Sequence, residues 1–305
     1  MFKKKFTKKM VRENIVAYTF LLPGLLLFLT VGLYSVIFSI RMSFYNWSGV
    51  DFSTARFEGL NNFKNILFGR NPQQTIDFRN AIFNNFKIAF FSIIVILPLA
   101  LIIAVMIQRT KKGGGVLRTI YFIPMVASGA AIYYAWQGLY ASDGVLNSFL
   151  SKIGLDFFVV RDGILGNPKT ALIGVIIVVI WTSLPSTMIL YYAGLSNISE
   201  SIYEAANIDG ASKFTVMWKI TWPLLKPMTV VALINALNAS FQMFDNIFIL
   251  TGGGPAKSTD VSGTLLYTTA FRDSQYGNAS AMGWTVFILT LILSLISLKR
   301  MKTDY

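Results

Sequence analysis

The sequence predicts an all-α polytopic membrane protein with about six transmembrane helices and a cytoplasmic helix–turn–helix loop. Of its 305 residues, 54% are hydrophobic and only 13% are charged, which is too little charge to cover a soluble chain of this length. The hydrophobic residues stand in long blocks, and an α-helix needs about 20 such residues to cross the hydrocarbon core. These blocks do not alternate as the strands of a closed barrel would. The predicted spans are residues 14–40, 88–108, 119–142, 170–194, 223–250 and 276–298.

The fifth span is the least regular of the six. Its charge-free run, residues 227–244, is short, but apolar sequence continues beyond Asp245 as far as Leu250. Pro223 suits an early helical position, because its missing N–H group would have no helical partner there. We therefore expect one helix over residues 223–250 with a single acid inside it.

The distribution of Lys and Arg predicts the orientation of the chain. With a cytoplasmic N-terminus, these residues are more than twice as dense in the inner segments as in the outer ones, in line with the positive-inside rule. The chain then divides into a basic cytoplasmic N-terminus (1–13), a transmembrane domain (14–299) and a cytoplasmic tail (300–305). Residues 14–40 are interpreted as a retained helix, because the run is too long for a signal peptide and no small-residue cleavage site follows it. Anionic membrane lipids are the expected partners of the N-terminal lysines, so the net charge of +13 requires no nucleic acid.

The composition also excludes several kinds of chemistry. The chain has no cysteine and no histidine, which removes disulfides, the commonest metal ligand and the commonest general base. The glycine triplets at 113–115 and 252–254 lack the lysine and hydroxyl residue of a phosphate-binding P-loop. A membrane enzyme would need a serine with a lysine or carboxylate partner, and no such pair lies within a predicted span. We expect neither enzymatic activity nor a metal site in this chain.

The longest cytoplasmic stretch, residues 197–221, predicts two short helices joined by a tight turn. Either Ser199 or Ser201 is suited to cap the first helix. Gly210 is placed to end that helix, because glycine adopts positive φ freely, and Ser212 is placed to cap the second. The alternative is an ordinary amphipathic loop that lies on the membrane surface.

This loop also contains a longer motif. The motif consists of Glu204, Ala205, Ala206, Asp209 and Gly210, followed by Ile220 and Pro223. At this spacing they resemble the signature loop of permease subunits of bacterial binding-protein-dependent ABC importers. Residues 244–255, which read FDNIFILTGGGP, are similar to the carbohydrate-uptake branch of that family, which includes the larger maltose-permease subunit. The loop departs from the family pattern at Ser199, where proline is common.

The resemblance implies a function and a set of partners. In the family the loop is the coupling element that sits in a cleft of the ATP-binding subunit, so the five residues from Glu204 to Gly210 named above are expected to contact that subunit. The chain would form half of the translocation pathway for a sugar or oligosaccharide in the bacterial cytoplasmic membrane. The other implied partners are a second permease subunit, a second copy of the ATP-binding subunit and an extracellular or periplasmic solute-binding protein. ATP and Mg would be held by the ATP-binding subunits, and this chain would hold no cofactor.

Four polar residues of the fifth span form a candidate solute path. Asn235, Asn238, Gln242 and Asp245 recur at helical spacing, which places them on one face. Amides and carboxylates at membrane depth normally face a cavity or a polar partner, and they suit sugar hydroxyls because they donate and accept hydrogen bonds. Trp181, near the middle of the fourth span, is a candidate for stacking on a sugar ring. The alternatives are that the polar groups hold neighbouring helices together and that Trp181 is a packing residue.

A second class of function is an ion-gradient-driven secondary transporter of a polar solute. Such a transporter needs ionisable groups within the membrane to couple ion and solute. Asp245 is the only acid inside a predicted span, which counts against this alternative.

Overall fold

The structure, a computed structural model, confirms the predicted all-α polytopic fold. It describes residues 8–69, 72–110, 113–155 and 159–302. Within these ranges, four helices are long and apolar enough to cross a membrane, and the number rises to six if each of two bent helix pairs forms one span. The only strands in the described ranges are β1 (Tyr45–Asn46) and β2 (Arg56–Phe57), which pair antiparallel.

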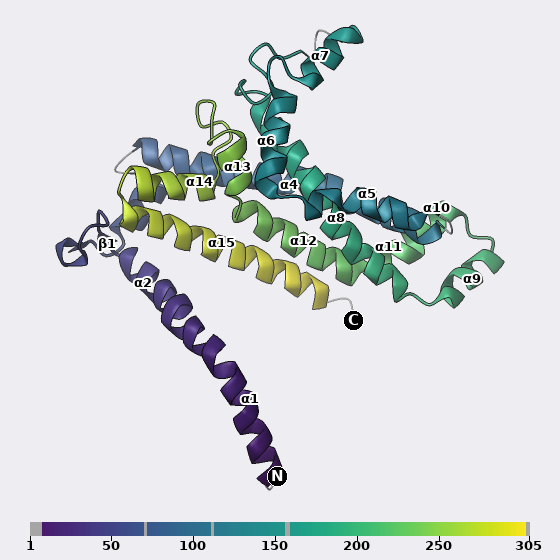
Figure 1. The fold of residues 1–305 in the computed structure, drawn as a ribbon, viewed down its shortest axis with the longest axis horizontal. Coiled ribbons are helices and arrows are strands. Elements are labelled where there is room, and N and C mark those ends of the chain that lie inside the picture. The colour runs from purple at the N-terminus through teal and green to yellow at the C-terminus, as the bar shows by residue number, and fades with distance from the viewer. Residues whose placement is uncertain (1–7, 70–71, 111–112, 156–158, 303–305) are drawn as a thin grey trace.

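Eight of the longer helices in the described ranges form most of the molecule (Figure 1). In chain order they are α1 (Lys8–Leu27), α2 (Tyr34–Met42), α4 (Pro72–Arg109), α5 (Gly114–Val126), α6 (Gly129–Tyr140), α8 (Ala171–Ser196), α12 (Lys226–Phe241) and α15 (Tyr276–Lys302). A π-helical segment, η1 (Phe28–Leu33), joins α1 to α2 without a break. Short elements connect the rest: η2 (Phe52–Thr54), α3 (Asn61–Phe68), α7 (Val145–Lys152), α9 (Glu200–Ile208), α10 (Lys213–Thr215), η4 (Val216–Thr221), α11 (Trp222–Leu224), α13 (Asp245–Leu250), α14 (Ser262–Tyr267) and η5 (Thr268–Arg272).

The core lies where α4 packs along α8, with α12 and α15 beside them. Val175 and Val178 of α8 are fully buried in one half of this interface, and Leu101 and Met188 are buried in the other. The opposite face of α4 exposes Phe90 and neighbouring apolar side chains. This distribution is the one expected of helices whose outer faces meet lipid.

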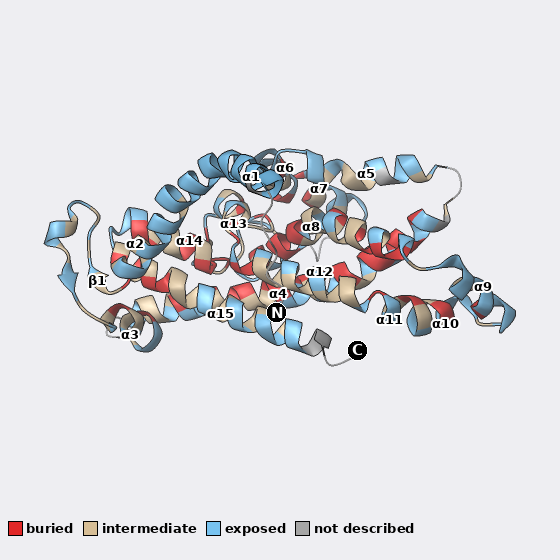
Figure 2. Ribbon diagram, turned by 90° about the horizontal axis from the view of Figure 1, so that it is seen from below, coloured by how far each residue is buried: buried red, intermediate tan, exposed pale blue. Residues whose placement is uncertain are grey.

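The first helix stands apart from the body. Figure 1 shows α1 leaving α2 as a separate rod, and Figure 2 shows it exposed along its length. From Ile15 to Leu27 nearly all its residues are apolar, and Phe20 is 84% exposed. The surface of α1 is therefore available to lipid or to another protein chain.

The third predicted span, residues 119–142, contains a sharp bend. Residues 114–126 and 129–152 lie at 95° to each other, with the break at Ala127 and Ser128. Pro124 weakens the end of α5, because it has no N–H group to donate to the carbonyl four residues before it. Ala127 then adopts an extended conformation, which redirects the chain into α6.

The expectation of one continuous helix over residues 223–250 was wrong. The chain bends by 69° between residues 213–224 and 226–241, and it breaks again at residues 242–244 before α13. The first break falls at Leu225, and Pro227 lies in the first turn of α12, where its missing N–H group needs no helical partner. Asp245 therefore begins a short helix rather than lying inside a long one.

Side chains from other helices account for the second break. The Asn85 amide donates to the carbonyl of Ser240 (2.6 Å), and the Ser262 hydroxyl donates to the carbonyl of Phe241 (3.2 Å). In a continuous helix these carbonyls would accept from backbone N–H groups four residues further on. Because α4 and α14 supply donors instead, α12 ends at Phe241 with these carbonyls satisfied.

We expect Asn85→Ala to destabilise the bundle. Asn85 is fully buried, and its side-chain oxygen also accepts from the backbone N–H of Ser262 (2.9 Å). Truncation leaves two buried backbone groups without partners, at a cost of about 1–3 kcal/mol each. Thermal denaturation in detergent tests this, with the exposed Asn80 of the same helix, changed to Ala, as the control. Equal melting temperatures for the two variants would show that this bridge does not stabilise the fold.

Candidate functional site

The predicted helix–turn–helix loop projects from one end of the molecule (Figure 1, right). Helix α9 ends at Ile208, and Gly210 follows with φ of +70°. The N–H of Gly210 donates to the carbonyl of Asn207 (3.1 Å), and the N–H of Ala211 donates to that of Ala206 (2.9 Å). This pair of bonds is a Schellman motif, which requires a left-handed residue where glycine is free of the Cβ penalty.

The two helix starts of the loop differ. Ser199 occupies the N-cap of α9, but its side chain makes no capping bond and its hydroxyl lies 2.7 Å from that of Ser201. Ser201 is inside the helix and is not its cap. The second helix has the expected cap, because the Ser212 hydroxyl accepts from the backbone N–H of Thr215 (3.2 Å).

The turn of the loop presents an open surface. Of the five motif residues, only Ala206 is buried, and the other four are exposed: Glu204, Ala205, Asp209 and Gly210. A Cβ added at Gly210 would meet nothing within 4 Å. Ile208 is 86% exposed and Phe214 is 73% exposed, so this surface combines apolar and acidic side chains outside the bundle.

A cavity of about 680 Å³, lined by polar and apolar side chains, lies between α4, α6, α8, α12 and α13. Three of the predicted path residues line it: Asn235, Gln242 and Asp245. All three are exposed in the described chain, so their amide and carboxylate groups are free to meet a solute.

The structure does not bring the other two predicted residues to this cavity. Asn238 is half-buried on another side of α12, whose cavity-lining positions include Ala232, Asn235 and Ala239. Trp181 lies outside the cavity and packs edge-on against Trp136, with ring centroids 5.8 Å apart.

Sequence reasoning missed the hydroxyl groups of the cavity. One face of α8 contributes Thr182, Ser183, Ser186 and Thr187. Their spacing, two adjacent pairs four residues apart, was a readable signal for a polar helix face. Ser92 of α4 also lines the cavity, and its buried hydroxyl has no hydrogen-bond partner in the described part of the chain. A group of this kind is available to a polar molecule inside the cavity.

Helices α6 and α13, which follow the breaks at residues 127–128 and 242–244, contact each other beside the cavity. The Gln137 side chain donates to the carbonyls of Ile249 (2.5 Å) and Leu250 (3.1 Å) at the end of α13. These bonds satisfy terminal carbonyls of a short helix. Helix α13 is therefore fastened to α6, and Tyr133 of α6 and Asp245 of α13 both face the cavity.

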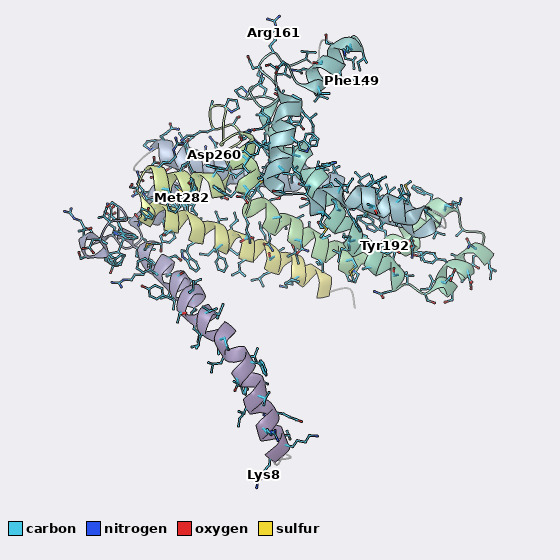
Figure 3. All side chains as sticks on the ribbon, viewed as in Figure 1. Lys8, Phe149, Arg161, Tyr192, Asp260 and Met282 are labelled. Atoms are coloured by element: carbon cyan, nitrogen blue, oxygen red, sulfur yellow. The ribbon has the colours of Figure 1, made fainter. Side chains whose placement is uncertain are left out.

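The glycine-rich motif after α13 folds into a compact loop. The hydroxyls of Thr251 and Thr259 are hydrogen-bonded at 2.7 Å, and Gly253 has φ of +87° with its α-carbon close to the Asp260 carboxylate. Burial raises the pKa of Asp260 (labelled in Figure 3), whose carboxylate accepts a hydrogen bond from Thr264. This loop is therefore a fixed connection between α13 and α14.

A helical membrane body with a cavity that contains amide, hydroxyl and carboxylate groups defines a class, a membrane transport subunit. Residues 96–300 match the family described as "Binding-protein-dependent transport system inner membrane component", and the chain belongs to this family. Its members are transport components of ABC importers. This membership supports the predicted permease, and it gives no support to the ion-gradient-driven alternative.

The chain is similar over nearly its full length to several known proteins. It is 36% identical to the "Probable ABC transporter permease protein YurN" of Bacillus subtilis, covering 96% of this chain and 99% of that one. It is 33% identical to the "Trehalose/maltose transport system permease protein MalF" of Thermococcus litoralis, covering 96% of each. A solved bacterial alginate ABC transporter, in complex with its alginate pentasaccharide-bound periplasmic protein, contains a chain of the same fold, with a TM-score of 0.78 and 25% identity over 95% of this chain and 94% of that chain.

The chain has no natural cysteine, so single cysteines report the cavity directly. We expect Gln242→Cys and Ser183→Cys to react with a small water-soluble maleimide faster than Asn238→Cys, because only the first two side chains line the cavity. The measurement is the labelling rate of the protein in lipid nanodiscs. Faster labelling at Asn238 than at the other two positions would contradict the assigned cavity face of α12.

Proposed function

We propose that this chain forms half of the translocation pathway of an ATP-driven sugar importer. The observation that carries the proposal is the projecting hairpin, with its exposed motif residues and its turn at Gly210. The chain would pair with a second permease of the same family, two ATP-binding subunits that hold ATP and Mg, and an external solute-binding protein. Relatives that transport trehalose, maltose or alginate support a carbohydrate as the solute.

The same proposal fixes the orientation of the chain. The hairpin that receives the ATP-binding subunit must be cytoplasmic, as the distribution of Lys and Arg also predicts. Both termini would then be cytoplasmic in a bacterial inner membrane, with lipid around the apolar outer faces of the helices. The compact loop at residues 251–261 and the β1–β2 hairpin would face outward.

The proposed coupling role makes a sharp prediction for Gly210→Val. Valine at φ of +70° costs about 1 kcal/mol or more in backbone strain. Its side chain would also project into the proposed contact with the ATP-binding subunit. We expect the complex to form in near-normal amounts but to lose solute-stimulated ATPase and uptake together. The measurement is subunit stoichiometry and ATPase activity of the purified complex, with and without loaded binding protein.

Gly59→Val is the matched control for this experiment. Gly59 also has positive φ (+55°) and open space around its α-carbon, but it lies far from the hairpin in the chain's outer segment. The two variants therefore carry similar backbone strain. Full solute-stimulated turnover in Gly210→Val would show that this hairpin is not the coupling element.

The proposed solute path predicts different effects at two amides of the same span. Gln242→Leu removes a hydrogen-bonding group from the cavity and should lower uptake several-fold, with assembly and basal ATPase retained. Asn238→Leu, outside the cavity, should have the smaller effect on uptake. The measurement is uptake of radiolabelled solute into proteoliposomes. If Gln242→Leu instead blocks assembly of the complex, this amide holds the bundle together and does not belong to the path.

A further inference from the structure

A continuous row of aromatic rings leads from the cavity to the end of the molecule opposite the α9 hairpin. We call it the aromatic ladder, and in spatial order it consists of Phe244, Tyr267, Phe271, Tyr276, Trp47 and Phe52. Each ring centroid lies 5.1–5.8 Å from the next. Phe244 lines the cavity beside Asp245, and Phe52 follows the outer strand β1, so the ladder joins the two regions.

The fold assembles this ladder from segments that are far apart in the sequence. One end comes from the connection before α13, the middle from α14 and η5, and the other end from the start of α15 and the β1–β2 hairpin. The hairpin backbone is shaped around the ladder, because Gly49 has φ of +96° and a Cβ there would lie 2.2 Å from the Tyr276 ring.

The ladder is not a buried core. Phe271 is 61% exposed, and the other five rings are all partly accessible. Phe248, which stacks on Phe244 at 5.0 Å, is also 45% exposed. Aromatic rings whose faces remain accessible are available for contact with a molecule that passes over them.

Polar groups flank the rings along the same route. Arg41 places its guanidinium 4.6 Å from the centroid of Phe52 at the outer end, and Arg272 and Asp273 are exposed next to Phe271. Gln242 and Asp245 lie at the inner end. A ring face bordered by donors and acceptors is the arrangement that binds a pyranose, whose C–H face is apolar and whose edge carries hydroxyls.

We propose that the aromatic ladder is a binding track for the pyranose rings of a saccharide that moves between the outer face and the cavity. Neighbouring rings are inclined to each other by 41–81°, so a sugar that moves along the ladder meets ring faces and ring edges in turn. The sugar stacks on the rings by dispersion while its hydroxyls exchange partners along the polar flank. This proposal rests on the proposed sugar importer, and it adds the route by which the sugar reaches the cavity.

A saccharide fits the ladder better than a lipid chain or a second protein chain does. Charged groups stand beside the exposed rings at Arg272 and Asp273, where a lipid tail would desolvate them at a cost. The ladder also ends in a cavity lined by amides, hydroxyls and a carboxylate, which continues the chemistry of a sugar route. Packing of a second permease on these rings is an outcome that the experiment separates.

The test uses the whole complex with its ATP-binding and solute-binding partners in proteoliposomes. The probes are radiolabelled maltotriose, cellotriose and raffinose, and the trisaccharide that the wild-type complex imports best is used for the variants. The readout is the amount of sugar imported per ATP hydrolysed at saturating loaded binding protein. We expect Phe271→Ala to lower this ratio about two- to tenfold, the loss typical of one aromatic contact, and Phe271→Trp to restore it.

Two further variants keep the result interpretable. Phe248→Ala, on α13, should lower the same ratio, so the test does not depend on local folding around Phe271. Phe68→Ala is the control, because Phe68 is 84% exposed at the end of α3 and is not part of the ladder. Its ratio should equal that of the wild-type complex.

Three outcomes overturn the proposal. Unchanged ratios in Phe271→Ala and Phe248→Ala, with normal wild-type import, refute the track but leave the sugar importer standing. Loss of the second permease from the purified Phe271→Ala complex would assign the ladder to a subunit interface. If the wild-type complex imports none of the three sugars although it hydrolyses ATP, the proposed sugar function itself fails, and the track fails with it.

Discussion

The structure depends on one constraint, that backbone N–H and C=O groups at membrane depth must find partners inside the protein. Unbroken helices such as α15, which contains no proline, satisfy it by themselves. The broken spans satisfy it with side chains from neighbouring helices. The Asn85 amide donates to the carbonyl of Ser240, and the Gln137 amide donates to the carbonyls at the end of α13. Broken helices are tolerated there because these side chains replace the missing helical bonds.

The break after Phe241 decides which polar residues of the fifth span reach the cavity. A continuous fifth span would carry its polar residues in one row through the bundle, whereas the break after Phe241 turns Asp245 and α13 toward α6. The cavity then collects groups from five helices, with hydroxyls from α8 opposite amides from α12. Its lining combines these polar groups with apolar side chains, an arrangement suited to a hydroxylated solute that also has apolar faces.

The hairpin and the cavity share a covalent connection. The second helix of the hairpin continues through η4 and α11 into α12, the helix that carries Asn235 and ends next to Gln242. A force applied at Gly210 is therefore delivered to the base of α12, across the 69° bend that precedes Pro227.

The sequence by itself determined the membrane class, the positions of the hydrophobic helices, the hairpin with its turn at Gly210 and the family. These features are local: they follow from runs of apolar residues, from residue types at fixed spacing, and from the freedom of glycine at positive φ. The tertiary structure decided where the spans bend, and so which polar residues reach the cavity. Asn238 has the spacing of a path residue but lies off the cavity, while Ser92 belongs to it without any sequence signal. The physical reason is that packing between α4, α8 and α12 decides which face of each helix lines the cavity. The break after Phe241 likewise depends on donors from α4 and α14, more than 20 residues away in the sequence, and no local pattern predicts such contacts.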